Sequence, residues 1–365
     1  MTRARLAPPR APAAEALGRL LIVGIPAPEL DAATRDFLAE VQPGGVILFR
    51  RNIPSSLQEL QALVADLHRL AWRPLVSIDH EGGRVMRLGE PFTQFPPMAC
   101  LGQQGDEDLA RAVGLAMGRE LATAGFDLVF APVLDVASRA DNPVIGDRAL
   151  SADPHRVARL GIALARGLAE GGVLPCGKHF PGHGDTAADS HVTLPRVEAD
   201  RAVLEARELV PFIAAAQAKL PALMTAHVVY PAWDPHRPAT LSPRILRAVL
   251  REQLRYRGLL VSDDLEMAAI AQGNDLGEAA LRALEAGVDG LLVCQTTEAA
   301  RTVHRALQRA WERGRLGPEL LAAPWQRWAA LHAQLPHQRP RCPLPCPEHR
   351  PRTRKEDSKR PSSRC

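Results

Sequence analysis

Residues 258–263 read "GLLVSD", a short run of apolar residues without polar alternation that ends in a carboxylate. A strand with one face in water alternates apolar and polar residues, whereas a parallel strand covered on both faces is apolar throughout. The segment therefore predicts a buried parallel strand with a reactive side chain at its carboxyl end.

The same pattern occurs seven more times, and amphipathic stretches rich in Ala, Leu, Arg and Glu separate the runs. Strands that alternate with helices indicate βαβ units, and eight such units predict an α/β fold with a single (β/α)8 TIM-type barrel over residues 15–335. An open doubly wound sheet is the less favoured alternative. The other apolar runs are residues 20–25, 45–49, 74–79, 126–135, 173–179, 221–227 and 290–294, and the helical stretches include residues 56–71, 108–124, 155–170, 199–218 and 276–286.

Residues 336–365 differ in composition from the rest of the chain, because they hold seven prolines and nine Lys or Arg against three Asp or Glu. Such a segment has too little apolar surface to join a core, so we expect a disordered Pro/Arg-rich tail, with residues 1–14 as a flexible N-terminus. The tail has a net charge of +6 and the whole chain +4, which leaves −2 for the remainder. The folded part is therefore not expected to bind nucleic acid.

The composition also limits the compartment and the cofactors. Hydrophobic residues make up 46% of the chain, yet no run of about 18 uncharged apolar residues is present, so no membrane association is expected. The N-terminal residues lack the apolar core of a signal peptide, which predicts a cytoplasmic protein. Cys100, Cys176 and Cys294 are interpreted as buried free thiols, and Cys342 and Cys346 lack the partner pair that a metal needs.

Polar or reactive side chains end most of the apolar runs. In a (β/α)8 barrel the carboxyl ends of the strands converge on one face, where active sites are built. Helix capping alone could explain an aspartate after a strand, but it does not explain Lys-His after one strand and His after the next. The predicted site therefore draws on Asp79, Asp135, Lys178, His179, His227 and Asp263.

One stretch concentrates chemistry more than any other: "GKHFPGHGDTAADSHVTLP", residues 177–195. Lys178 and His179 end the fifth predicted strand. The Gly and Pro residues that follow prevent regular structure, so residues 180–194 are expected to form a loop that acts as a mobile lid.

Asp189 and His191 lie two residues apart in that loop. A carboxylate at this spacing can bind one imidazole nitrogen in a turn, which fixes the tautomer and supports proton transfer by the other nitrogen. The pair therefore has the composition of an acid/base dyad that operates near neutral pH.

Four segments together resemble the signature motifs of glycoside hydrolase family 3, in its bacterial β-N-acetylglucosaminidase branch (the NagZ type). They are "SIDHEGGRVMRL" (77–88), "NPVIGDRAL" (142–150), "KHFPGHGDTAADSH" (178–191) and "GLLVSDDLEM" (258–267). The resemblance covers residues 15–335 and implies a retaining exo-β-N-acetylglucosaminidase. It also implies a carbohydrate substrate, anhydro-muropeptides of peptidoglycan recycling, and a monomer without metal or organic cofactor.

The resemblance also implies a role for each matching residue. Asp263 matches the nucleophile, His191 the proton donor and acceptor, and Asp189 its partner in the dyad. A histidine donor departs from the usual second carboxylate, but it adds no anionic repulsion against the nucleophile. The residues that hold the terminal N-acetylglucosamine are Asp79, Arg87, Arg148, Lys178 and His179.

Several neighbouring residues are expected to support the site. Asp264 is interpreted as structural, His183 and Asp185 as residues that shape the loop, and His227 as a hydrogen-bonded supporting residue. His80 stands where many relatives carry Gln, and Glu266 is expected to face solvent.

Three alternatives remain open. The first is a phosphorylase of the same family, since a neutral histidine does not repel phosphate. The second is a metal-dependent barrel hydrolase that uses the histidines and aspartates as ligands. The third is a sugar-binding protein without catalysis.

Overall fold

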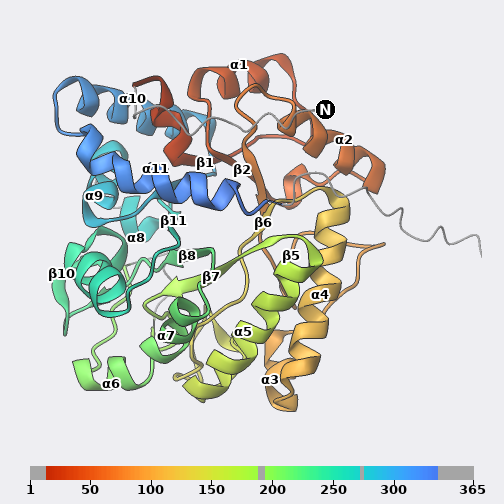
Figure 1. Cartoon of the computed structure of the whole chain (residues 1–365), viewed down its shortest axis with the longest axis vertical. Coiled ribbons are helices and arrows are strands. Elements are labelled where there is room, and N and C mark those ends of the chain that lie inside the picture. Colours follow the sequence, from red (N-terminus) through yellow and green to blue (C-terminus); the bar gives the residue numbers. More distant parts are fainter. Residues whose placement is uncertain (1–13, 188–193, 272–274, 336–365) are drawn as a thin grey trace, which may run out of the picture.

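The computed structural model describes residues 14–187, 194–271 and 275–335, and its strands form one closed barrel. The order around the barrel is β1-β12-β11-β8-β7-β6-β3-β2, and every neighbouring pair is parallel. This confirms the (β/α)8 TIM-type fold over the open sheet (Figure 1). The strands are Leu21–Gly24 (β1), Gly45–Leu48 (β2), Leu75–Ile78 (β3), Leu128–Val129 (β6), Leu174–Phe180 (β7), Ala222–Thr225 (β8), Leu259–Asp264 (β11) and Gly290–Val293 (β12).

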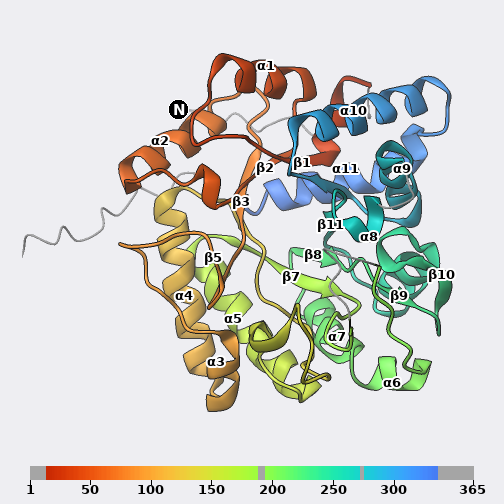
Figure 2. The ribbon, with the colours of Figure 1, turned by 180° about the vertical axis from the view of Figure 1, so that it is seen from behind.

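Helices surround the barrel, as the view from behind also shows (Figure 2). Their starting points follow from capping side chains: Ser56, Asp106, Asp153 and Asp275 each accept a hydrogen bond from a backbone N–H in the first turn that follows. The α-helices are Ala32–Val41 (α1), Leu57–His68 (α2), Met98–Gln104 (α3), Glu107–Ala124 (α4), Pro154–Gly171 (α5), Arg201–Ala206 (α6), Leu209–Gln217 (α7), Ala268–Ala271 (α8), Leu276–Ala286 (α9), Thr297–Glu312 (α10) and Pro318–His332 (α11), and a π-helix covers Arg244–Gln253.

Three expectations differ from the structure. The predicted helix 199–218 is divided into α6 and α7, and Pro211 lies in the first turn of α7, where its missing N–H costs no helical hydrogen bond. The strand predicted over residues 126–135 is regular only at Leu128–Val129, because Pro132 has no N–H to continue the ladder. Cys100 is exposed, since α3 buries Met98, Leu101 and Gly102 on its opposite face.

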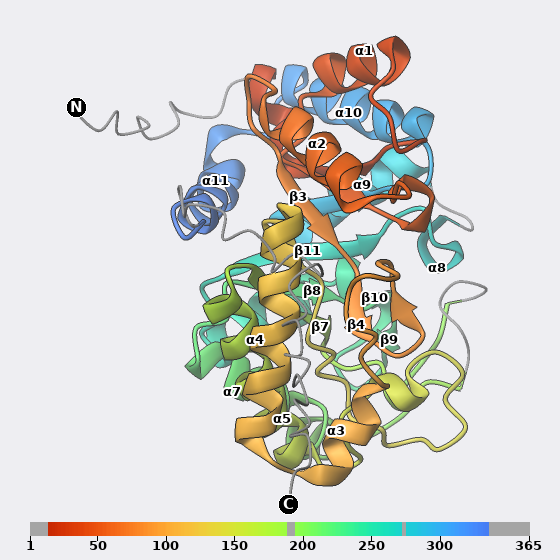
Figure 3. The same cartoon turned by 90° about the vertical axis from the view of Figure 1, so that its right-hand side faces the viewer.

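The two ends of the barrel are closed differently (Figure 3). Helix α11 lies at the amino end of the strands, where the indole of Trp328 donates to the carbonyl of Asp289 at 2.9 Å. Two hairpins, His80–Gly82 with Val85–Met86 (β4, β5) and Val229–Tyr230 with Asp234–Pro238 (β9, β10), lie at the carboxyl end. The carboxyl ends of the strands are therefore the end left for a site, as in other barrels of this type.

Within the described ranges, no helix is long and apolar enough to span a membrane.

Candidate active site

A buried lysine lies at the centre of the site. Lys178 belongs to β7 and is 3% exposed, and its ammonium lies 2.7 Å from Asp79 Oδ1 and 2.6 Å from Glu81 Oε1. Asp79 follows β3 and Glu81 lies two residues on, so the alternation of an extended chain directs both carboxylates to the same side. Two anions thus hold the one ammonium.

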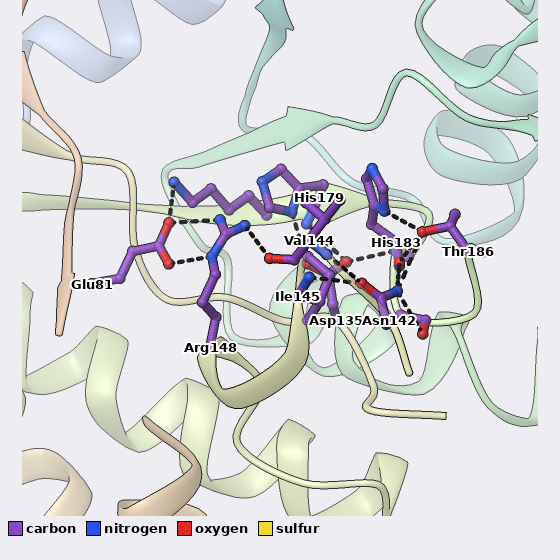
Figure 4. Close-up of polar contacts among 12 residues, drawn as sticks. Glu81, Asp135, Asn142, Val144, Ile145, Arg148, His179, His183 and Thr186 are labelled. Carbon is purple, nitrogen blue, oxygen red and sulfur yellow. Dashed lines mark hydrogen bonds and ion pairs between the residues drawn. The ribbon is translucent and has the colours of Figure 1, made fainter. Parts of the chain in front are cut away.

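Arg148 completes this cluster from a third part of the chain (Figure 4). Its guanidinium binds Glu81 through Nε at 2.8 Å and Nη2 at 2.9 Å, and Nη1 donates to the carbonyl of Val144 at 3.1 Å. Burial alone would raise the pKa of Glu81, but Lys178 and Arg148 outweigh it and hold that pKa well below its ordinary range. Glu81 therefore stays ionised and fixes both cations.

Glu81 lies within the first of the four motifs, but no role for it was predicted. The sequence shows a charged residue between His80 and Gly82, and the structure shows that all three residues are buried. A buried carboxylate needs partners, and both partners come from segments far away in the sequence. Arg87 adds a weaker contact, with Nη2 at 3.4 Å from Asp79 Oδ2. Four of the five residues predicted to bind sugar thus belong to one network: Asp79, Arg87, Arg148 and Lys178.

The fifth, His179, is anchored separately by Asp135. The ring nitrogen Nδ1 lies 2.7 Å from Asp135 Oδ2, while Oδ1 accepts the backbone N–H groups of His179 at 3.2 Å and His183 at 2.7 Å. Burial works to raise the pKa of Asp135, but the two histidines and these hydrogen bonds lower it overall. Asp135 is fully buried, so the structure makes it a supporting carboxylate beneath the site.

The first half of the predicted lid makes several hydrogen bonds to another part of the chain. The amide nitrogen of Asn142 donates to the carbonyls of His183 and Gly184, each at 2.9 Å, and lies 3.2 Å from the Thr186 hydroxyl. A Cβ at Gly184 would stand 1.6 Å from the carbonyl oxygen of Val136, so no other residue fits this approach. Residues 181–187 therefore form a hydrogen-bonded turn after β7, because the Asn142 side chain supplies donors to the carbonyls of His183 and Gly184. The mobility of the loop stays a prediction.

The same turn is supported from α6 and α7. Arg207 bridges Asp185, at 2.5 Å, and Glu208, at 2.7 Å. The second oxygen of Glu208, Oε2, is buried without a hydrogen-bond partner in the described part of the chain, and it would stand 2.6 Å from a Cβ at Gly182. Burial raises the pKa of Glu208 to about 7, although Arg207 opposes the shift. Asp185 is thus a shaping residue of the loop, as expected.

Asp263 occupies the carboxyl end of β11. Its Oδ1 accepts the N–H of Asp264 at 2.8 Å, and the side chain is partly exposed. Burial works to raise the pKa of Asp263, but His227, His179, the Asp264 N–H and Lys178 lower it below the ordinary value. The group is therefore an anion at neutral pH, the form that a nucleophile needs.

The two other histidines near the strand ends have supporting geometry. His227 is fully buried, with Nδ1 at 2.7 Å from the Thr240 hydroxyl and Nε2 at 3.0 Å from the carbonyl of Asp264, so both ring nitrogens are occupied. Nδ1 of His183 lies 2.9 Å from the Thr186 hydroxyl. Burial lowers the pKa of His183 to about 4, and this favours a neutral ring. These contacts agree with the supporting roles expected for both.

Asp264 and Glu266 tie β11 to the segment after β12. Asp264 Oδ2 accepts from the Gln295 side chain at 2.8 Å, which agrees with the structural role expected for it. Glu266 was expected to face solvent, but its carboxylate accepts the N–H of Gln295 at 2.7 Å and the Thr296 hydroxyl at 2.9 Å. Because Thr296 caps α10, Glu266 supports the start of that helix.

The contacts described above do not include Asp189, His191 or His80. Asp189 and His191, the predicted acid/base dyad, lie outside the described residues. His80 is 1% exposed, and its Nδ1 has no hydrogen-bond partner in the parts of the chain described. In those same parts, no group of three His, Cys, Asp or Glu side chains is arranged to hold a metal ion.

Comparison of the sequence with known proteins gives a consistent result. Residues 13–330 match the N-terminal domain of glycosyl hydrolase family 3. A β-hexosaminidase of Methylococcus capsulatus is 45% identical over 284 residues, which are 77% of this chain and 84% of that protein. A β-hexosaminidase of Alkalilimnicola ehrlichii is 43% identical over 294 residues, or 79% and 84% of the two chains.

Solved structures agree with the sequence matches. NagZ from Neisseria gonorrhoeae, in complex with N-trifluoroacetyl-D-glucosamine, superposes with a TM-score of 0.73 at 37% identity, over 87% of this chain and 96% of that one. A glycoside hydrolase family 3 β-N-acetylglucosaminidase from Paenibacillus sp. str. FPU-7 gives a TM-score of 0.85 at 39% identity, and the match covers 88% of this chain but only 62% of that one. A match over most of the chain at this identity leaves one assignment: the chain belongs to glycosyl hydrolase family 3.

Proposed function

We propose that this chain is a retaining exo-β-N-acetylglucosaminidase, a β-N-acetylhexosaminidase that hydrolyses terminal β-linked N-acetylglucosamine. The observation that carries the proposal is the position of Asp263 relative to the Lys178 cluster, which consists of Lys178, Asp79, Glu81, Arg87 and Arg148. Asp263 is the residue before the last of β11 and Asp79 follows β3, and three strands separate β11 from β3 in either direction around the barrel. A sugar ring across the barrel end can then meet Asp263 at its anomeric carbon and the charged cluster at its far hydroxyls.

The charged cluster suits the recognition of hydroxyl groups. Lys178, Arg148 and Arg87 supply N–H donors, Asp79 supplies an acceptor, and His179 supplies a ring nitrogen. Because Glu81 and Asp79 already pair with these cations, the donors are held in fixed directions before the sugar arrives. Pre-organised donors and acceptors lose little entropy on binding, so they can be used to orient the anomeric carbon.

The proposed reaction proceeds in two displacements. In the first, a carboxylate oxygen of Asp263 forms a bond to the anomeric carbon as the glycosidic C–O bond breaks, and His191 donates a proton to the leaving oxygen. In the second, His191 takes a proton from water, the water oxygen attacks the anomeric carbon, and Asp263 leaves as a carboxylate. Asp189 is proposed to orient His191 throughout.

The proposed substrates are anhydro-muropeptides with a terminal N-acetylglucosamine. This substrate class would place the enzyme in peptidoglycan recycling in the cytoplasm, and so in the cell-wall biogenesis that underlies cell shape and cell division. The support for it is the resemblance of the four motifs to those of the NagZ type. We propose a monomer that acts without a cofactor.

One experiment tests the proposal directly. The protein is incubated with 4-nitrophenyl β-N-acetylglucosaminide and with the matching β-glucoside, each with and without inorganic phosphate. Release of nitrophenol from the first substrate only, with free N-acetylglucosamine as product in both buffers, is the expected result. A sugar phosphate as the main product would identify a phosphorylase, and no release from either substrate would contradict a glycosidase.

A further inference from the structure

Within the described residues, the Asp135 carboxylate makes its hydrogen bonds to one short segment, His179–His183. The carboxylate receives the ring Nδ1 of His179 and two backbone N–H groups, and its exposed fraction is zero. Asp135 does not reach solvent, and in the described part of the chain its carboxylate makes no hydrogen bond to the side chains of the Lys178 cluster. Any effect of Asp135 on a bound sugar that is carried by hydrogen bonds must therefore pass through His179 or the turn that follows it.

The contact with the ring determines a tautomer. An ionised carboxylate accepts hydrogen bonds and donates none, so Nδ1 of His179 must carry a proton. In the neutral ring the other nitrogen, Nε2, then has a free lone pair. No hydrogen bond to Nε2 is recorded in the described residues, and the side chain is 7% exposed. The buried end of the ring is thus fixed, and an acceptor remains at the other end.

We propose that Asp135 is a positioning residue that holds His179 as an acceptor for one sugar hydroxyl. The proposal rests on the proposed function, because it takes the sugar to bind beside Lys178 and His179. An acceptor has a specific use here, since the Lys178 and Arg148 groups only donate and the Asp79 carboxylate is already paired with Lys178 and Arg87. A hydroxyl that donates to Nε2 is distinguished from a methoxy or hydrogen substituent, either of which leaves a buried nitrogen unpaired.

If Asp135 only anchored the turn, Asp135→Asn should leave KM unchanged. Asn in place of Asp135 keeps an oxygen for the two backbone N–H groups, so the turn at His183 retains its anchor. The new amide nitrogen donates to Nδ1 and forces the proton of the ring to Nε2. Asp135→Asn therefore reverses the tautomer while it preserves the backbone contacts.

The chain offers a matched control at the opposite end of the barrel. Asp127 precedes β6 and is 7% exposed, and its Oδ2 lies 2.7 Å from Nε2 of His68 and accepts the N–H of Val76 at 2.9 Å. It has the same chemistry as Asp135, a buried carboxylate between an imidazole and a backbone N–H. Asp127→Asn should therefore destabilise the fold to a similar degree without a change at the sugar site.

The experiment measures kcat and KM on 4-nitrophenyl β-N-acetylglucosaminide for wild type, Asp135→Asn, His179→Gln, the double variant and Asp127→Asn. We expect KM to rise roughly 10- to 100-fold in Asp135→Asn, with a smaller change in kcat. We expect the double variant to match His179→Gln within about 3-fold, since Asp135 acts through the ring. Asp127→Asn should stay within about 3-fold of wild type.

A second measurement keeps the inference testable if Asp135→Asn folds poorly. Nitrogen-15 spectra of the imidazole rings in wild type should contain the signal of a neutral ring with its proton on Nδ1 that is missing from the spectrum of His179→Gln. An Nε2–H tautomer for His179, an unchanged KM in a folded Asp135→Asn, or multiplied effects in the double variant would each overturn the inference. Wild type without activity on the substrate would instead overturn the proposed function.

Discussion

The guanidinium of Arg148 binds the carboxylate of Glu81 through two hydrogen bonds, 2.8 and 2.9 Å long, and the Glu81 side chain is 1% exposed. The two residues are 67 positions apart in the sequence. Because Glu81 also holds Lys178, this pair connects the segments after β3 and β6 to β7, and so links the geometry of the site to the stability of the barrel.

Replacement of Glu81 by Gln should cost much more stability than a surface change of the same kind. Lys178 and Arg148 would keep their charges in a buried place without their shared anion, and the loss of one partner of such a group costs about 3–5 kcal/mol. Glu170→Gln, which breaks an exposed pair with Arg111, should cost less than about 1 kcal/mol. Urea unfolding of both variants measures the difference, and equal midpoints would contradict the role given to Glu81.

Replacement of Asp263 should mainly lower turnover, whereas replacement of the adjacent Asp264 should mainly lower stability. Asp263→Ala removes the proposed nucleophile, so turnover should fall on the order of 10⁴-fold with little change in melting temperature. Asp264→Ala loses the hydrogen bond to Gln295 and should lower stability by about 1–3 kcal/mol with a much smaller loss of turnover. A 5-fluoro glycosyl donor followed by mass spectrometry should label Asp263. Labelling of Asp264 would reverse the two assignments.

His191→Ala should affect substrates according to their leaving groups. A poor leaving group needs a proton, whereas an activated aryl group departs unaided, so the loss in kcat should be severe for the first and small for the second. Azide should restore turnover of the activated substrate as an external nucleophile, and Asp189→Ala should show a weaker form of the same pattern. Equal losses for both substrates would remove His191 from the acid/base role.

Lys178→Ala should lower kcat/KM for both kinds of leaving group alike, by a factor that corresponds to a loss of roughly 2–4 kcal/mol of transition-state stabilisation. The reason is that it removes a charged donor to the sugar and not a proton donor to the leaving group. Lys219→Ala, which changes an exposed lysine, is the control and should behave as wild type. A loss that varied with the leaving group would place Lys178 in the chemical step.

Glu208 should make the protein less stable as pH rises from 5 to 8. Its pKa is about 7 in the folded state against an ordinary 4.5, so the folded state holds a proton that the unfolded state has released. The stabilising contribution of the protonated form is complete below about pH 4.5 and is lost as pH rises through 7. Glu208→Gln keeps the neutral shape, so its stability relative to wild type should increase by about 2–3 kcal/mol between pH 5 and 8, as measured by urea unfolding. A difference that does not depend on pH would show that Glu208 is ionised throughout.

The sequence by itself determined the number and the order of the strands. Eight unalternating apolar runs separated by amphipathic helices predict a closed parallel barrel, because this pattern is local and each run needs cover on both faces. It also determined which residues stand at the carboxyl ends of the strands, including Asp79, Lys178, His179 and Asp263. Once the barrel is known, those residues must share one face.

Only the tertiary structure decided which of these residues bind one another. Lys178 and Asp79 are 99 positions apart, and the buried roles of Glu81, Asp135 and Asn142 depend on contacts across 40 or more positions. No local pattern encodes such a pairing, since it depends on how the closed strands align and on which loops then meet above them. For the same reason the contacts of the turn after β7 could not be predicted: its Gly and Pro residues are visible in the sequence, but the donors that hold it come from other parts of the chain.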